Sequence, residues 1–360
     1  MKAILVAAAI AASAAGAHAS AWVGWNRPTS AFANSADLAN QDSHNYIRVQ
    51  DSQPADPVLL LFLPGTGSDN IGEYTDFLNA AASHGYYVLG LDYRHGQHHP
   101  HMVGCWDSGW VEYYVQQIYG VGDTFWPHWL PTQPAGDNSI DHRVKVALQA
   151  LDSDHVGGIT FAWSSHFWDA ANNRPKWENI VIAGHSQGAE MAAYISRYEP
   201  VRGGLVFEGL YDRLNIGAPD AGLDYTKLAG PSVTPDCYGA EADVSPSWIT
   251  PGDWVDNFFL ITSQKSSAYD GTWPGHHIAA TGADAGKRWD MVITGTPSSL
   301  TGGWYTIDAP LNAGCDSGHA QPINNGCYPT WMPTFWGMLL DRAKTIRTNP
   351  VPNPIHFIVL

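Results

Sequence analysis

The 360-residue chain has little positive charge, few cysteines and no long apolar run after its first residues. It has 18 Lys and Arg against 34 Asp and Glu, and the resulting net charge of −16 argues against nucleic acid or an anionic membrane surface as the partner. After residue 19 no segment reaches the roughly eighteen consecutive apolar residues that a membrane span needs, so we expect none. No repeat, charge run or Ser/Gly linker marks a domain boundary, and the oligomeric state is left open.

The first nineteen residues predict a secretory signal peptide. They read MKAILVAAAIAASAAGAHA, which combines one lysine, a short alanine-rich apolar run and an A-x-A site. We expect cleavage before Ser20 and a secreted or periplasmic protein. Residues 20–360 would then form a single domain, with irregular insertions at about 94–137 and 210–253 that lack a hydrophobic period.

Four cysteines in an exported chain favour two disulfides over free buried thiols. Cys315 and Cys327 enclose the shortest loop and are the easiest pair to close. Cys105 and Cys237 would then join the two insertions. This is our preferred pairing among the three connectivities that four cysteines allow.

Apolar runs and helical spacings alternate along the chain, which predicts a parallel sheet with crossover helices. Gly85 is placed to end the first helix, Asn138 or Ser139 to begin the second, and the last helix is expected despite Pro333. The apolar tail can be interpreted as an edge strand. Strands are expected within residues 57–67, 86–93, 203–209, 256–263 and 302–310, helices within 70–85, 138–155 and 330–347, and a strand passing into a helix within 179–198.

Many aromatic residues lie in segments without a clear period. They either pack the insertions onto the core or line an apolar substrate cleft. They include Trp106, Trp110, Tyr113, Tyr114, Trp126, Trp129, Trp163, Phe167 and Trp168.

Ser186 lies in the stretch AGHSQGAEMA, which contains the pattern G-x-S-x-G. In a chain with 36 glycines the pattern alone could mark an ordinary glycine-rich turn. Here a β-branched apolar run precedes it and apolar residues at helical spacing follow it. A strand that turns sharply into a helix at this pattern is the nucleophile elbow, so we predict that Ser186 is a nucleophile.

A serine nucleophile needs a histidine base, and the elbow predicts one later in the chain. His319 follows the last expected strand, where carboxyl ends of strands converge, and the Cys315–Cys327 disulfide would stiffen its loop. The alternative is an ordinary surface-loop histidine. His276, His277 and His356 are weaker candidates.

The base needs a carboxylate to orient it. Asp270 follows the strand expected within residues 256–263, although Asp-Gly is also a common turn signal. Glu208, at the end of the preceding strand, is the main alternative acid. Asp284 and Asp290 rank behind it.

The oxyanion formed during acyl transfer needs backbone N–H donors. We predict that the amide of Gln187, which follows the nucleophile, is one donor. We place the other donor in the turn PGTG, at Thr66 in preference to Gly67. A plain strand-exit turn would also favour these glycines.

Taken together, GHSQG and the element order resemble the α/β-hydrolase superfamily in its esterase and lipase branch, although PGTG stands where family members often carry His-Gly. The resemblance implies an α/β fold of three layers, with a mostly parallel eight-stranded sheet, helices on both faces and irregular aromatic-rich insertions. It also implies no cofactor and a small-molecule or polymeric ester substrate. The expected chemistry is ester hydrolysis through an acyl-enzyme with a Ser-His-Asp triad.

Three other functions are compatible with parts of the sequence. The tract RHGQHHPH, with His95, His98, His99 and His101, is typical of metal-binding segments but contains no Cys or acidic ligand. A peptidase or amidase would use the same triad. A non-catalytic binding protein could use the same scaffold, although such proteins usually lack part of the triad.

Overall fold

A computed structural model describes the parts of the chain that build the predicted core. The signal peptide, the apolar tail, the histidine tract, Cys105, Cys237 and most of both insertions lie outside the described residues. The described residues are 22–28, 44–50, 54–65, 71–93, 114–120, 139–154, 160–209, 214–215, 243–244, 258–263, 290–300, 303–313, 315 and 318–345.

A sheet of nine strands forms the centre of the fold, in the order β1-β2-β4-β3-β7-β8-β11-β13-β12. Only β2 runs antiparallel to its neighbours, and every other pairing is parallel. The expected mostly parallel sheet is therefore confirmed, and β12 adds an edge strand to the eight expected. The strands are β1 (Trp22–Pro28), β2 (His44–Gln50), β3 (Leu59–Leu63), β4 (Tyr87–Gly90), β7 (Ile180–His185), β8 (Gly203–Phe207), β11 (Phe258–Ser263), β12 (Asp290–Ile293) and β13 (Trp304–Ile307).

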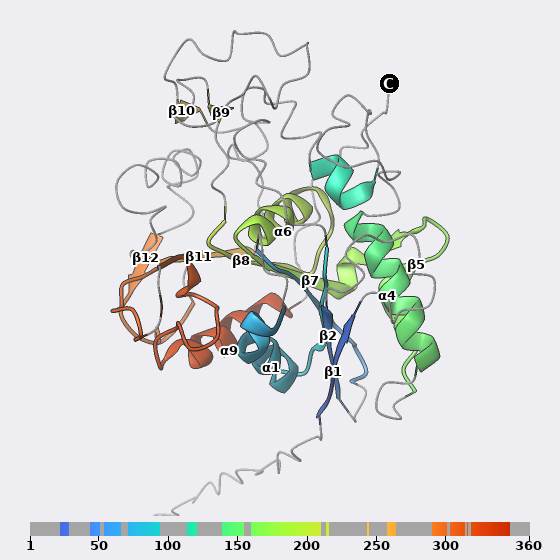
Figure 1. Cartoon of the computed structure of the whole chain (residues 1–360), viewed down its shortest axis with the longest axis horizontal. Coiled ribbons are helices and arrows are strands. Elements are labelled where there is room, and N and C mark those ends of the chain that lie inside the picture. Colours follow the sequence, from blue (N-terminus) through green and yellow to red (C-terminus); the bar gives the residue numbers. More distant parts are fainter. Residues whose placement is uncertain are drawn as a thin grey trace, which may run out of the picture.

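Helices cover both faces of this sheet, as expected (Figure 1). Helices α1 (Thr75–Ser83) and α9 (Met332–Ala343) pack on one face. Helices α4 (Ile140–Asp154), α5 (Trp163–Phe167) and α6 (Gln187–Tyr198) pack on the other. This three-layer arrangement explains why β3, β7, β8 and β11 are buried at every position, because both of their faces are covered.

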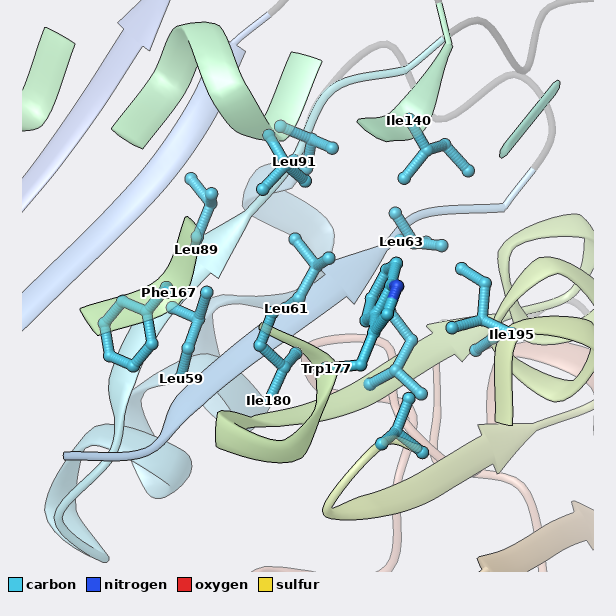
Figure 2. Packing of buried hydrophobic residues seen from close by; sticks show 14 of the residues in the cluster. Leu59, Leu61, Leu63, Leu89, Leu91, Ile140, Phe167, Trp177, Ile180 and Ile195 are labelled. Atoms are coloured by element: carbon cyan, nitrogen blue, oxygen red, sulfur yellow. The ribbon is translucent and has the colours of Figure 1, made fainter. Parts of the chain in front are cut away.

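The side chains of β3 show how one strand contributes to both layers. Leu59, Leu61 and Leu63 belong to the cluster beneath α4, α5 and α6, in which Leu59 lies beside Phe167, and Leu63 lies near Ile140 and Ile195 (Figure 2). The alternate residues of β3 belong to the cluster beneath α1 and α9. Successive side chains of a strand point to opposite faces, so one apolar run supplies two cores.

The helix ends confirm the predicted signals. The Ser139 hydroxyl accepts a hydrogen bond from the His142 amide at 3.1 Å, which makes Ser139 the N-cap of α4. Gly85 follows α1 with φ +83°, the left-handed conformation that glycine adopts easily. Pro333 is the second residue of α9, where its missing N–H breaks no helical hydrogen bond.

The described aromatic residues of the irregular segments pack in the core. The Tyr87 ring stacks on Phe161 with centroids 4.0 Å apart and meets Trp163 edge-on at 5.3 Å. In the first insertion residues 114–119 are helical, and Tyr114 stacks on Tyr194 at 4.8 Å. These contacts confirm the packing interpretation for the residues they involve.

Several short elements and one disulfide complete the described structure. The predicted Cys315–Cys327 bond is present, with Cα atoms 5.3 Å apart. Among the helices of the described segments, none combines the length and the apolar character needed to span a bilayer. The short elements are η2 (Ile71–Tyr74), β5 (Trp168–Asp169), β6 (Arg174–Pro175), η5 (Trp177–Asn179), β9 (Leu214–Asn215), β10 (Asp243–Val244) and η7 (Gly318–Ala320).

A buried ion pair joins the end of β4 to α4. The Arg143 Nη1 donates to Asp92 Oδ2 at 3.2 Å, and both side chains are at most 3% exposed. The Asn45 side chain accepts a hydrogen bond from the Asp92 amide at 2.8 Å. The segment that leaves β4 is therefore held by both its backbone and its side chain.

We expect Asp92→Ala to lower the free energy of unfolding by about 3 kcal/mol, because it leaves the Arg143 charge buried without its carboxylate. Urea denaturation measures this loss. The control is Asp341→Ala, because Asp341 is 67% exposed and contacts His84 at the surface. That variant should lose less than about 1 kcal/mol. Equal losses in the two variants would contradict a structural role for the buried pair.

Candidate active site

Ser186 is the single residue between strand β7 and helix α6. Its φ of +53° and ψ of −123° lie outside the regions that non-glycine residues normally occupy. The Ser186 amide donates to the Phe207 carbonyl at 2.9 Å, and its own carbonyl accepts from Ala189 at 2.9 Å. The predicted strand–turn–helix geometry is therefore present, with Ser186 in a strained conformation at its tip.

Two glycines allow the backbone to turn this tightly. A Cβ added to Gly184 would lie 2.1 Å from the Gly188 carbonyl oxygen. A Cβ added to Gly188 would lie 2.1 Å from the Leu63 carbonyl oxygen in β3. No side chain fits at either position, so the motif's glycines are required by the contact of α6 with β7 and β3.

The turn after β3 meets the same tip. A Cβ at Gly65 would lie 3.0 Å from the Ser186 Cβ, so the backbone of this turn runs directly beside the serine. The Gly65 amide donates to the Tyr74 hydroxyl at 3.3 Å. Thr66, the predicted oxyanion donor, lies outside the described residues. Gln187, the other predicted donor, is the first residue of α6, where amides are not used in the helix's own hydrogen bonds.

His319 lies in η7 beside the residue that precedes Ser186. Its backbone carbonyl is 2.8 Å from His185 Nε2, and the two imidazole rings have centroids 4.7 Å apart. The His319 side chain is 32% exposed. The fold thus brings together two predicted residues, Ser186 and His319, that are far apart in the sequence.

Glu208 is the carboxylate that contacts His319 among the described residues. It follows β8 with φ +53°, is fully buried, and places Oε2 3.6 Å from His319 Nδ1. Its other carboxylate oxygen accepts a hydrogen bond from the Ser263 amide. Glu208 was the alternative acid of the sequence prediction.

The other predicted acids have no observed place at this site. Asp270, the first choice, and Asp284 lie outside the described residues, as do His276, His277 and His356. Asp290 is the first residue of β12, so it lies at the amino edge of the parallel sheet, opposite to the edge where Ser186 lies. Its ranking as a reserve acid was therefore wrong.

The register of the sheet places Ser186 and Glu208 at the same edge, on neighbouring strands. His185 pairs with Phe207 in the parallel ladder of β7 and β8, so the next residue of each strand leaves the sheet at the same level. Both next residues have positive φ. The site also lies where the strand order changes direction, between β3 and β7, the usual place for ligand sites in parallel sheets.

A buried glutamine, Gln321, ties the His319 loop to the sheet. Its amide nitrogen donates to the carbonyls of Ala309 at 3.0 Å and Pro310 at 3.2 Å. The Ser263 hydroxyl donates to its side-chain oxygen. Sequence reasoning missed Gln321, because nothing in its local pattern separates it from a loop residue.

His185 was also missed, although it lies inside the motif. Its side chain is 5% exposed, and burial, with the nearby His319 ring as a smaller cause, lowers its pKa to about 3. The Tyr74 hydroxyl lies 3.1 Å from its Nδ1. A polar residue at the end of an apolar strand was the available signal, because buried polar groups need partners.

No group of three or more potential metal-ligating side chains occurs within the described part of the chain. The His95–His101 tract lies outside it. The metal-binding interpretation of that tract therefore stays a prediction.

No family model matches the chain, and no curated protein matches it. Among solved structures it is similar to Thermogutta terrifontis esterase 2 phosphoramylated by tabun, with 14% identity, a TM-score of 0.41, and coverage of 88% of this chain and 92% of that one. It is also similar to FphF, a Staphylococcus aureus fluorophosphonate-binding serine hydrolase, with 12% identity, a TM-score of 0.38, and coverage of 90% and 98%. Likeness at this level says nothing about the site.

We expect the stability to depend on His185 below neutral pH. The folded-state pKa is about 3, below the unfolded value of 6.5, so the unfolded chain binds a proton that the folded chain excludes. The stability from the neutral ring is complete above pH 6.5 and is lost as the pH falls toward 3. The slope is about 1.4 kcal/mol per pH unit in this range.

Urea denaturation at pH 5.5 and 4.5 measures this slope in the wild type and in His185→Gln. In His185→Gln the unfolding free energy should depend less on pH, because the contribution of the His185 ring is gone. Tyr86→Phe is the control, because it removes a buried hydroxyl that donates to the Leu340 carbonyl and leaves every histidine in place, and it should keep the wild-type pH dependence. A wild-type slope retained by His185→Gln would contradict the prediction.

Proposed function

We propose that the protein is a serine hydrolase of carboxylic esters, with Ser186 as the nucleophile and His319 as the general base. The proposal rests on the geometry at the end of β7. Ser186 has a strained conformation between strand and helix, and His185, the residue before it, is hydrogen-bonded to His319. Strain of this kind persists at functional sites because the surrounding fold holds it in place.

The proposed reaction follows from these positions. His319 takes the hydroxyl proton as the Ser186 oxygen attacks the ester carbonyl carbon, and a tetrahedral oxyanion forms. The protonated imidazole then gives its proton to the leaving alcohol, which yields the acyl-enzyme. Water, deprotonated by His319, attacks the acyl carbon, and the imidazolium then returns this proton to the Ser186 oxygen as the acyl C–O bond breaks and the acid leaves.

We assign the role of the acid to Glu208 in preference to Asp270. Its support is the 3.6 Å separation from His319 Nδ1, which is an ion-pair distance once the ring is protonated. The Ser263 amide fixes the carboxylate, and full burial strengthens its interaction with the imidazolium. Glu208 would thus hold the ring with Nε2 available to Ser186.

The oxyanion donors of the proposal are the amides of Gln187 and Thr66. Gln187 begins α6, whose N-terminus favours negative charge. The Gly65 amide donates to the Tyr74 hydroxyl, so we do not assign Gly65 as an oxyanion donor. Thr66 follows Gly65 in the sequence, and Gly65 lies beside Ser186, which supports the choice of Thr66.

The proposed location is outside the cytoplasm, as a single domain that follows the signal peptide. The Cys315–Cys327 disulfide supports this location, because such bonds persist in oxidising compartments. The proposed substrates are small or polymeric esters, including lipids and carbohydrate-linked esters. A peptidase, or a binding protein without turnover, is an outcome that the following test distinguishes.

We expect hydrolysis of 4-nitrophenyl butyrate by the wild type and at least a ~10³-fold lower kcat in Ser186→Ala, because the variant has no nucleophile. The release of 4-nitrophenol is followed by absorbance. Ser165→Ala, which changes an exposed serine of α5, serves as the control and should match the wild type. Equal rates in all three proteins would favour a binding protein, and turnover of anilides in preference to esters would favour an amidase.

The two candidate acids are separated by isosteric amides. We expect Glu208→Gln to lower kcat by roughly 10³-fold, because an amide cannot stabilise the imidazolium as a carboxylate does. Asp270→Asn should stay within about threefold of the wild type on this assignment. The reverse ranking would return the role of the acid to Asp270 while leaving Ser186 and His319 in place.

A further inference from the structure

A chain of three hydrogen bonds connects the turn after β3, the serine tip and the His319 loop. The Gly65 amide lies 3.3 Å from the Tyr74 hydroxyl, which lies 3.1 Å from His185 Nδ1. His185 Nε2 lies 2.8 Å from the His319 carbonyl oxygen. Each element of the proposed site is thus joined to the next through the ring of His185.

We propose that His185 is a positioning residue for His319, and that Tyr74 fixes the ring form in which His185 acts. The inference rests on the proposed function, because it assigns a task to a residue next to the proposed nucleophile. His185 itself has no place among the groups that exchange protons or electrons with the substrate.

The direction of each hydrogen bond follows from its ends. A carbonyl oxygen carries no proton, so His185 Nε2 donates to the His319 carbonyl. In a neutral imidazole the other nitrogen is then an acceptor, and the Tyr74 hydroxyl donates to it. The Tyr74 oxygen in turn accepts from the Gly65 amide. One tautomer of His185 satisfies all three bonds.

The ring is buried deeply enough to keep this form. His185 is 5% exposed and Tyr74 is 1% exposed. The Tyr74 ring packs on Phe62 with centroids 4.8 Å apart, so its hydroxyl is held by its surroundings. The opposite tautomer would place a ring nitrogen without a proton against the carbonyl of His319, which is a repulsive contact.

The anchor of the bridge is rigid. His185 is the last residue of β7 and pairs with Phe207 in the ladder. The next residue is Ser186, whose backbone is held by the contacts of Gly184 and Gly188. A hydrogen bond from this anchor to the His319 backbone therefore fixes the position of the base relative to the nucleophile, because His185 is directly bonded to Ser186 in the chain.

Two other restraints on the His319 loop act from different sides. Gln321 ties the loop to the segment after β13, and the disulfide closes it on itself. Neither reaches the serine tip. The Nε2 bond of His185 links the backbone of His319 to the nucleophile's own strand. Its loss should thus affect the chemical step more than substrate binding, because an error of about 1 Å in such geometry costs roughly 10²-fold in rate.

Four variants test the proposal through kcat and KM for 4-nitrophenyl butyrate. His185→Leu removes the donor, and kcat should fall at least ~10-fold with KM within about twofold. His185→Gln restores an N–H donor at the position of Nε2, and should recover kcat to within about threefold of the wild type. Tyr74→Phe removes the hydroxyl that selects the tautomer of His185, and should lower kcat about 3- to 10-fold.

Tyr86→Phe is the matched control for the loss of a buried tyrosine hydroxyl. Its hydroxyl donates to the Leu340 carbonyl at 2.6 Å beneath α9, remote from the serine tip. It should lower the unfolding free energy without lowering kcat. Equal kcat in His185→Leu and His185→Gln, or losses that simply follow stability across all four variants, would overturn the proposal.

A measurement that needs no turnover completes the test. In selectively ¹⁵N-labelled protein, the ring of His185 should show a protonated Nε2 and an unprotonated Nδ1, in the wild type and in Ser186→Ala. A protonated Nδ1 would overturn the bridge even where His185→Leu fails to fold. Absence of hydrolysis by the wild type would overturn the proposed function, whereas the tautomer decides the bridge by itself.

Discussion

The contact of helix α6 with the backbones of β7 and β3 is the constraint on which the rest of the site depends. Gly184 and Gly188 have no side chain because carbonyl oxygens occupy the space where a Cβ would lie. With the helix that close to the strands, the residue joining them must turn through a positive φ, and Ser186 does so at +53°. The strain falls on Ser186, whose side chain carries the hydroxyl of the proposed nucleophile.

The register of β7 with β8 places the residue after β8 next to the turn at Ser186. The pairing of His185 with Phe207 brings the exits of β7 and β8 to one level, and Glu208 leaves its strand with the same φ as Ser186. The His319 loop then closes over both exits, with its side chain toward Glu208 and its backbone toward His185. A parallel sheet thus assembles from separate segments a group of residues that could perform acyl transfer.

Much of this could be predicted from the sequence because the signals were local. A β-branched run before G-x-S-x-G and a helical period after it were enough to predict the turn at Ser186, and the capping role of Ser139 followed from its place before an apolar period. The place of Glu208 beside the exit of β7 depends on register between strands, which no local pattern contains. The partners of His185 could not be predicted either, because Tyr74 is 111 residues away and read as an ordinary apolar helix position.

Covalent labelling tests the central claim most directly. The wild-type protein is incubated with a fluorophosphonate, digested, and mapped by mass spectrometry while the remaining esterase activity is followed. The account predicts one adduct, on the peptide that contains Ser186, and loss of hydrolysis in proportion to its formation. Hydrolysis that persists after Ser186 is fully modified, or inactivation with Ser186 unmodified, would contradict it.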